Sequence, residues 1–202
     1  MSAPSSDAGS TRDPAYTDRL MASVQRSSGI RRLAQLPYRR HIRAMHLGRV
    51  LDVGCGVGRN LVFLDGNGVG IDHNPSSVQV ARNRGLIVYS TDEFPQSADA
   101  VDGAFDTLLV AHVLEHMGEA EARALLTTHI RYVRRGGSVV AICPQQRGQA
   151  SDPTHVTALP APRLRALLES CGVTVAAIHS FPFPTWMGRI FTHNETVARG
   201  TV

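Results

Sequence analysis

Histidine and carboxylate side chains are closely spaced in the segment HVLEH, residues 112–116. On a helix, positions i, i+3 and i+4 share one face, so the spacing predicts that His112, Glu115 and His116 lie together. A further acid and imidazole occur downstream, in a DPTH segment that ends at His155. Imidazoles and a carboxylate gathered in this way could bind a divalent metal. Without a metal, His116 or His155 could act as a general base.

A glycine-rich segment, LDVGCGVG, lies at the end of an apolar run and predicts a strand-to-helix turn. Its glycines, Gly54, Gly56 and Gly58, would let the backbone approach a ligand closely. The dinucleotide fingerprint is GxGxxG, but Arg59 stands in place of its third glycine, so no pyrophosphate-binding motif is present. Asp72, which ends the next apolar run, could accept hydrogen bonds from both hydroxyls of a ribose.

The elements that position these residues are predicted from short apolar runs separated by helix-like segments. Strands are expected at 49–53, 69–71, 86–89, 107–110, 138–143 and 173–178. Helices are expected at 76–84, 119–134 and 162–170, the second of them ended by Gly136-Gly137. Strands that alternate with helices indicate an α/β fold, with a parallel sheet covered by helices on both faces.

Three regions are expected along the chain. Residues 1–13 are rich in Ser, Ala and Asp and predict a disordered tail. Residues 14–48 predict a helical cap of two or three short helices, interrupted at 27–29 and at Pro37. The main domain would span 49–202. No secretory signal and no membrane-spanning run is recognised, so the protein is expected in the cytoplasm, away from membranes.

Charge and cysteine content narrow the function classes. All 21 basic residues are Arg, the net charge is +4, and the Arg are mostly spread out, so a nucleic-acid partner is not expected. The three cysteines are far apart and form no CxxC pair, which disfavours a disulfide framework or a thiolate zinc site. The oligomeric state is left open by the sequence.

Three blocks of the sequence resemble, in order, conserved blocks of class I S-adenosylmethionine (SAM)-dependent methyltransferases. They are VLDVGCGVGRN, VGIDHNP and FDTLLVAHVLEHM, and the resemblance covers 49–199. It is strongest in the bacterial small-molecule group known as types 11 and 23. The resemblance implies a Rossmann-like, mostly parallel sheet of seven strands, in which the last strand is antiparallel and 173–178 and 195–197 form the final hairpin.

The same resemblance implies roles in cofactor binding. Gly54, Gly56 and Gly58 would line the methionine part of SAM, and Asp72 would hold the ribose. The other cofactor residues would be His73 beside the adenine, Asp92 accepting from the adenine amine, Ala111 and His112 after the fourth strand, and Asp52 before the glycines. For Asp92, a simple turn after the third strand remains the alternative.

The histidine-rich segment is similar to the ExxEH…H metal site of small-RNA 2′-O-methyltransferases and ubiquinone-pathway O-methyltransferases. Glu115, His116 and His155 match that pattern, and His112 replaces its first Glu. The resemblance implies a divalent cation such as Mg²⁺, although an imidazole suits Mg²⁺ less well than a carboxylate. Leu-Glu-His after the fourth strand is also widespread in metal-free methyltransferases, so both readings stay open.

The expected reaction is O-methylation of a small polyol, saccharide or phenol. A metal-free N- or C-methyltransferase and a non-catalytic SAM-binding domain are the alternatives. The compact length, the Arg-only basicity and the possible metal face also look similar to mycobacterial O-methyltransferases of methylmannose polysaccharide precursors, but none of these features specifies mannose. The aromatic segment 181–186 is expected either to wall the acceptor pocket or to pack on the core.

Overall fold

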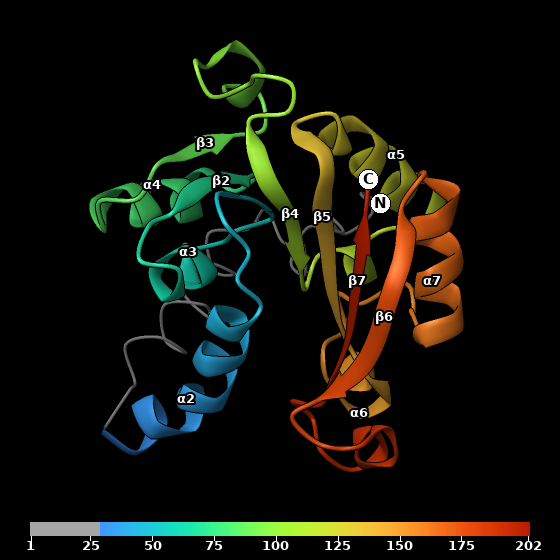
Figure 1. The fold of residues 1–202 in the computed structure, drawn as a ribbon. Helices are drawn as coiled ribbons and strands as arrows, with labels where there is room; N and C mark the ends of the chain where they lie inside the picture. The colour runs from blue at the N-terminus through green and yellow to red at the C-terminus, as the bar shows by residue number, and fades with distance from the viewer. Residues whose placement is uncertain (1–28) are drawn as a thin grey trace, which may run out of the picture.

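One seven-stranded sheet forms the centre of the protein, with the strand order β3-β2-β1-β4-β5-β7-β6 (Figure 1). The computed structural model describes residues 29–202. The strands are β1 (Val50–Val53), β2 (Gly68–Asp72), β3 (Val88–Ser90), β4 (Phe105–Ala111), β5 (Val133–Pro144), β6 (Thr174–Phe181) and β7 (Glu195–Thr201). Strands β1 to β5 pair in parallel, and β7 pairs antiparallel with β5 and β6. The predicted α/β fold with an antiparallel last strand is therefore confirmed.

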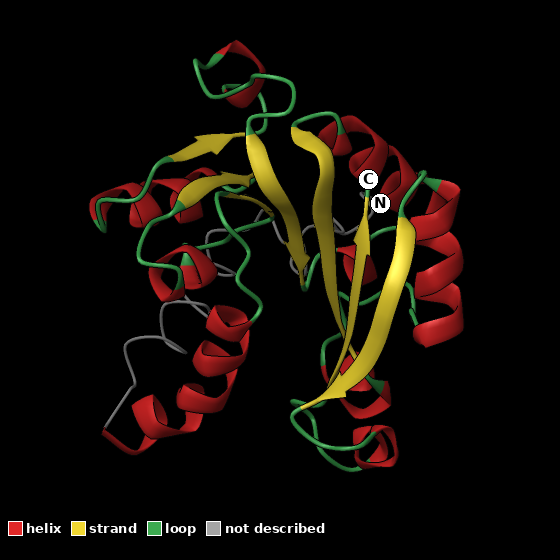
Figure 2. Ribbon diagram, viewed as in Figure 1, coloured by secondary structure: helices red, strands yellow, loops and turns green. Residues whose placement is uncertain are grey.

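Helices cover both faces of the sheet (Figure 2). Their bounds are α2 (Gly29–Ala44), α3 (Arg59–Phe63), α4 (Pro75–Asn83), α5 (Glu119–Ile130), α6 (Gln146–Ser151) and α7 (Ala161–Ser170). Three short 3-10 helices are η1 (Phe94–Gln96), η2 (Leu114–His116) and η3 (Thr185–Arg189). Helices α5 and α7 pack on one face, and α2 and α3 pack on the other.

Strand β4 shows why the sheet is buried on both sides. Its successive side chains point to opposite faces, as in any strand. Leu108 and Val110 belong to the core under α5 and α7, whereas Leu109 and Ala111 belong to the core under α2. An apolar run without polar alternation is typical of a parallel strand that is covered on both faces.

The chain differs from expectation where α5 ends. The helix stops at Ile130, not Arg134, because Val133 already pairs with Phe105 at the start of β5. The Gly136-Gly137 pair lies within β5 and does not end the helix. The register shifts there, and a Cβ on Gly137 would lie 2.8 Å from the Asp106 carbonyl oxygen, so glycine permits the irregular pairing.

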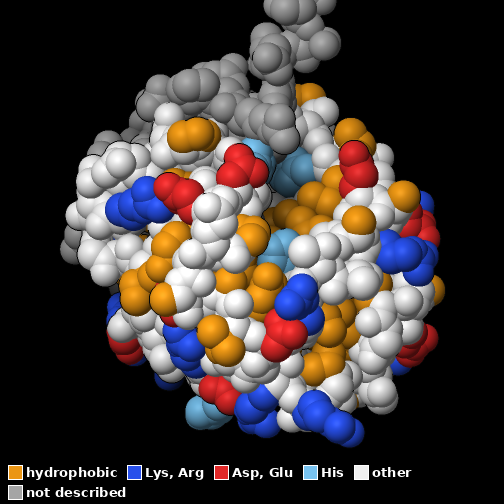
Figure 3. Space-filling model, turned by 90° about the horizontal axis from the view of Figure 1, so that it is seen from above, with side chains coloured by type: hydrophobic (Ala, Val, Ile, Leu, Met, Phe, Trp, Pro, Cys, Tyr) orange, Lys and Arg blue, Asp and Glu red, His pale blue; other side chains and the backbone are white. Residues whose placement is uncertain are grey.

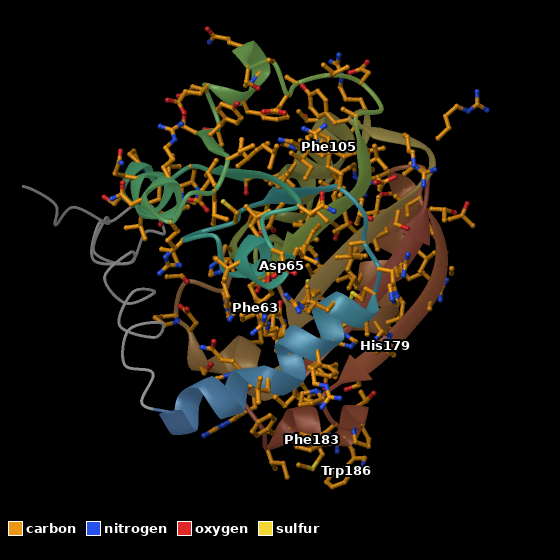
Figure 4. All side chains as sticks on the ribbon, turned by 60° about the vertical axis from the view of Figure 1, so that its left-hand side comes forward. Phe63, Asp65, Phe105, His179, Phe183 and Trp186 are labelled. Atoms are coloured by element: carbon orange, nitrogen blue, oxygen red, sulfur yellow. The ribbon has the colours of Figure 1, made fainter. Side chains whose placement is uncertain are left out.

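The helical cap also differs from expectation over its described part. A single helix, α2, runs through Pro37, where two short helices were expected. Ile42 on this helix is fully buried against the sheet, and Arg43 donates to the backbone oxygen of Phe63 in α3 (2.7 Å) and pairs with Asp65. These contacts hold α2 against α3 (Figure 4). The predicted tail at 1–13 and the first half of the cap, 14–28, lie outside the described residues.

Opposite charges alternate along the edge where β4 begins. Arg131 pairs with Asp102 (2.8 Å) and Arg134 pairs with Asp106 (2.7 Å). Figure 3 shows acidic and basic side chains interspersed over the face seen from above.

Among the described residues, none of the helices has the length and apolar character needed to cross a bilayer. The opposite edge, where β1, β2, β4 and β5 end, carries the predicted site residues.

Candidate functional site

A cavity of about 610 Å³ opens at the carboxyl ends of β1, β2, β4 and β5. Its walls come from the β1–α3 turn, the residues after β2 and β4, the α6 segment and the start of β7. The predicted site residues that line it are Gly54, Gly56, Asp72, His73, Ala111, His112, His116 and His155. Ligand pockets commonly enclose ~300–1,000 Å³, so this cavity suits a molecule of cofactor size.

The glycine turn is held against the neighbouring strand. The amides of Gly54 and Cys55 both donate to the backbone oxygen of Ile71, at 2.8 and 3.0 Å. Gly54 has φ +75°, and a Cβ there would clash with the Val113 side chain. The turn therefore needs glycine both for its backbone conformation and for the close approach of the segment after β4.

Gly58 has a packing role that was not expected. It also has a positive φ, +79°, but a Cβ on it would meet Leu86 and Ala81, and it does not line the cavity. Its place is at the packing of α3 against α4. Helix packing therefore by itself requires glycine at this position, and a cofactor contact of Gly58 stays a prediction.

Asp72 lies at the end of β2 with its carboxylate held in place by backbone amides. Gly56 donates to Oδ2 (2.7 Å) and Asn74 donates to Oδ1 (2.9 Å). The residue is only 6% exposed, yet it lines the cavity. Each carboxylate oxygen has a further lone pair, so Asp72 can accept from two neighbouring hydroxyl groups of a ligand without moving.

Asp52 and Asp92 do not line the cavity, contrary to expectation. Asp52 points into the protein, where it is 1% exposed and neither carboxylate oxygen accepts a hydrogen bond of normal geometry from a described residue. Burial raises the pKa of Asp52 to about 7, although Asn60 and Arg59 oppose the shift. Asp92 is exposed on the turn after β3, and the neighbouring Thr91 lines the cavity instead.

Asp52→Asn is expected to remove a pH dependence of stability in the cofactor-free protein. The folded pKa, about 7, lies above the unfolded value of ~3.9, so the native state binds the extra proton between these values. This contribution to stability is full below about pH 4 and is lost as pH rises through 7. The variant should therefore gain ~2–3 kcal/mol relative to the parent between pH 5 and pH 8, measured by urea unfolding. An equal difference at both pH values would contradict the prediction.

The segment after β4 is not the α-helix that the spacing predicts. His112 has φ +59°, in the left-handed region, and the chain then forms the 3-10 helix η2 over Leu114–His116. The tight turn still brings His112 close to Glu115, because His112 Nδ1 lies 3.5 Å from Glu115 Oε1. The expected neighbours are thus present through a different backbone geometry.

Glu115, His116 and His155 form a cluster in which one potential ligand atom from each lies within 4.8 Å of the other two. Glu115 is fully buried, and neither of its carboxylate oxygens accepts a hydrogen bond of normal geometry from a described residue. His155 Nε2 lies 4.0 Å from Glu115 Oε1. The His112 imidazole lies 3.5 Å from this carboxylate, and a bound cation in closer contact would compensate its buried charge further.

Each histidine of the cluster is oriented through its other ring nitrogen. Thr154 Oγ1 lies 3.0 Å from His116 Nδ1, and the backbone oxygen of Gln149 lies 3.1 Å from His155 Nδ1. In both rings Nε2 is the nitrogen left for a ligand. Contacts to the ring nitrogen that faces away from the site are typical of metal-binding histidines.

Backbone hydrogen bonds bring His155 to η2 across a long stretch of chain. The amides of Val156 and Thr157 donate to the Glu115 backbone oxygen, at 2.8 and 3.0 Å. The Thr157 hydroxyl donates to the backbone oxygen of Met117 (2.7 Å). The predicted return of the DPTH segment to this edge of the sheet therefore occurs, and three hydrogen bonds around one turn maintain it.

His112 does not belong to the metal-like cluster, contrary to expectation. Its Nε2 lies 2.8 Å from Glu195 Oε1, while its Nδ1 faces Glu115. Burial lowers the pKa of His112, but the carboxylates of Glu195 and Glu115 outweigh that effect and raise the pKa to about 9. A histidine that carries two protons has no lone pair for a metal, so His112 is a poor ligand at neutral pH.

His116 has the opposite electrostatic character. Burial lowers its pKa, and the attraction of Glu115 does not overcome that effect. His116 is therefore neutral at pH 7 and can serve as a ligand or as a base. Asp152 stays ionised, because hydrogen bonds from Thr154 lower its pKa despite burial, which acts to raise it. Asp152 also lines the cavity and adds negative charge beside both histidines.

Several residues that line the cavity were not predicted from the sequence. Glu195 begins β7 and holds His112, while Thr192 and His193 precede it, and Gly148 lies in α6. None of them belongs to a recognisable motif. An ionisable residue at the start of a predicted C-terminal strand was the only available signal, and by itself it does not indicate a site.

Comparisons with known proteins agree with this architecture. Residues 50–137 match the family described as a methyltransferase domain. A SAM-dependent methyltransferase from Archaeoglobus fulgidus has a TM-score of 0.69 at 19% identity, covering 92% of this chain and 99% of that chain. No curated protein sequence matches significantly.

Two further solved structures share the fold. A SAM-dependent methyltransferase from Thermotoga maritima, described as a possible histamine N-methyltransferase, has a TM-score of 0.66 at 18% identity, covering 93% of this chain and 94% of that chain. Magnesium protoporphyrin IX methyltransferase from Synechocystis, with bound S-adenosylhomocysteine (SAH), has a TM-score of 0.64 at 14% identity, with 95% of each chain covered.

Proposed function

We propose that this protein uses SAM to methylate a hydroxyl group of a small acceptor, such as a polyol or saccharide, beside a divalent metal ion. The match of residues 50–137 to a methyltransferase domain supports the methyl transfer. The observation that carries the proposal is the buried Glu115 carboxylate, which accepts no hydrogen bond of normal geometry from a described residue, next to two oriented histidines. SAM supplies an electrophilic methyl group on a positively charged sulfur, so the remaining task is to position and deprotonate the acceptor.

The chain's own residues suit the cofactor. The glycine turn offers close backbone approach at Gly54 and Gly56, and the oriented carboxylate of Asp72 suits the two ribose hydroxyls. His73, Ala111 and His112 line the same cavity and complete the proposed cofactor contacts. Asp52 and Asp92 lie outside the cavity, so we assign them no direct contact with SAM.

Glu115, His116 and His155 are the proposed metal ligands. Two imidazoles and one carboxylate favour Mn²⁺, Fe²⁺ or Zn²⁺ over Mg²⁺, which prefers oxygen ligands. A divalent cation there would supply positive charge that lowers the pKa of an acceptor hydroxyl. The ionised Asp152 at the same wall offers a hydrogen-bond acceptor for further hydroxyl groups, which supports a polar acceptor.

A metal-free reaction is the second candidate, and the lowered pKa of His116 favours it. A neutral imidazole at the cavity wall can take a proton directly from an acceptor. In that case Glu115 would orient or stabilise the histidines and would not bind a cation. The two candidates differ in their response to a chelator.

Chelation is expected to abolish methyl transfer while SAM binding persists. Purified protein would be treated with EDTA, and transfer of labelled methyl from SAM would be measured over a panel of polyols, sugars, phenols and amines. SAH affinity would be measured in parallel by calorimetry. Activity should fall at least about 100-fold and return with Mn²⁺ or Zn²⁺. Full activity in EDTA, from protein free of metal, would leave only the metal-free candidate.

A further inference from the structure

A second cavity lies on the other side of α6. Its volume is about 730 Å³, and it is bounded by α6, the start of α7, β6 and η3. Among residues 29–202, Pro144 alone lines both cavities. The second cavity is therefore a separate space, and the proposed methyl transfer makes no use of it.

Helix α6 and the chain before β7 form the partition between the two cavities. Gly148 packs so closely on this segment that an added Cβ would lie 2.5 Å from the Thr192 backbone oxygen and 3.0 Å from Pro144 Cβ. A molecule cannot pass through this contact. A ligand of the second cavity is therefore a different molecule from the cofactor or acceptor that would react in the first cavity.

The walls of the second cavity are mainly apolar. Helix α6 contributes Ala150, the segment before α7 contributes Ala158 and Pro160, and β6 contributes Ile178. Trp186 of η3 lines it too, although 64% of this residue is exposed. Figure 4 shows Trp186 and Phe183 together at the edge of the molecule, below α2. Exposed aromatic surface beside a cavity of this size is typical of a ligand site.

Of the two alternatives expected for the aromatic segment 181–186, packing on the core holds for Phe181, which packs against the core under α2. Phe181 stacks on His41 of α2, with ring centroids 3.9 Å apart, and does not reach the cofactor cavity. Trp186 lines the second cavity rather than the first. Residues of the β6–β7 connection therefore line both cavities: Trp186 lines the second, and Thr192 and His193 line the first.

The charge at the rim of the second cavity indicates that its ligand is negatively charged. Arg189 lines the cavity, is exposed, and forms no ion pair with any described side chain. An anionic group placed beside it would gain a charge-assisted contact without losing an existing one. The ring-sized apolar space and this guanidinium together suit a small molecule with an aromatic ring and one negative charge.

We propose that the second cavity binds a small aromatic acid, separate from the cofactor and from the methyl acceptor. Occupancy should act on His155 and not on the residues proposed to contact the cofactor. Gln149 lines the second cavity, and its backbone oxygen lies 3.1 Å from His155 Nδ1. A ligand that orders α6 would therefore hold His155 in the position described above.

The protein has one tryptophan, so its fluorescence reports directly on this cavity. The probe is 8-anilinonaphthalene-1-sulfonate, an aromatic acid, compared with uncharged N-phenyl-1-naphthylamine. The sulfonate should quench Trp186 emission at one saturable site, and saturating SAH should leave its Kd within about twofold. Loss of the quenching on addition of SAH would place the probe in the first cavity and overturn the proposal.

Two variants test the position of the site. Ala150→Phe should fill the cavity and weaken the sulfonate at least about tenfold, whereas Ala124→Phe, at an exposed site on α5, should leave its Kd unchanged. Arg189→Gln should weaken the sulfonate about three- to tenfold and leave the uncharged probe unaffected. SAH affinity reports whether each variant is folded. Unchanged sulfonate binding in both folded pocket variants would overturn the proposal, whatever the outcome of the methylation assays.

Discussion

Glu115→Gln is expected to lower Mn²⁺ affinity at least about 100-fold and to abolish metal-stimulated methyl transfer, with SAH affinity kept within about twofold. The amide keeps the shape of the side chain but removes the negative charge that a cation needs. Glu115 is fully buried and does not line the cofactor cavity, so direct loss of cofactor contacts is not expected. Calorimetry with Mn²⁺ and with SAH measures both affinities without knowledge of the acceptor.

Glu169→Gln provides the matched control for this variant. Glu169 is exposed on α7, where it pairs with Arg165 at 3.3 Å, and its neutralisation should change neither affinity. Glu115→Gln also removes the ion pair with His112 Nδ1 at 3.5 Å, so Tm is measured beside both affinities to show that the variant is folded. Wild-type Mn²⁺ affinity in a folded Glu115→Gln protein would exclude Glu115 as a ligand.

Asp72→Ala is expected to weaken SAM binding at least about tenfold. Each hydrogen bond from a ribose hydroxyl to this carboxylate contributes ~1.5–3 kcal/mol, and ~1.4 kcal/mol corresponds to a factor of ten. The variant also frees the amides of Gly56 and Asn74, so the glycine turn loses part of its order. Calorimetric titration with SAM and with SAH measures the loss.

Asp72→Asn separates the two effects, because the amide keeps one acceptor oxygen for the turn but cannot accept at both positions. It should bind SAM with an affinity between those of the parent and Asp72→Ala. Asp102→Ala is the control, since its side chain is 63% exposed at the opposite edge of the sheet. Parental SAM affinity in folded Asp72→Ala would remove this residue from the cofactor site.

Local sequence patterns were sufficient to predict the fold and many of the residues that line the first cavity. Apolar runs separated by amphipathic segments predicted a parallel sheet. In such a sheet the carboxyl ends of the strands lie at the same end of the sheet. The glycine turn and Asp72 were predicted because each lies at the end of its own strand. Their neighbours are set by β1–β2 pairing, in which Asp52 lies opposite Gly70 and Val53 opposite Ile71.

The segment around η2 shows where local reasoning reached a correct grouping through a wrong geometry. Helical spacing predicted one face for His112, Glu115 and His116, but His112 adopts a left-handed conformation and turns toward Glu195. Glu195 lies 83 residues further along the chain, and it reaches His112 because β7 inserts between β5 and β6. Spacing along one segment contains no information on such a partner.

The sequence by itself determined which residues could bind a cofactor and at which edge of the sheet, because strand ends and turn glycines are properties of short segments. Only the tertiary structure decided the electrostatic state of each group. Glu195 keeps His112 charged, burial keeps His116 neutral, and the 154–157 backbone brings His155 to Glu115. The second cavity likewise exists only through the packing of α6 against the chain before β7. These features depend on contacts between distant segments, and burial and charge act through space rather than along the chain.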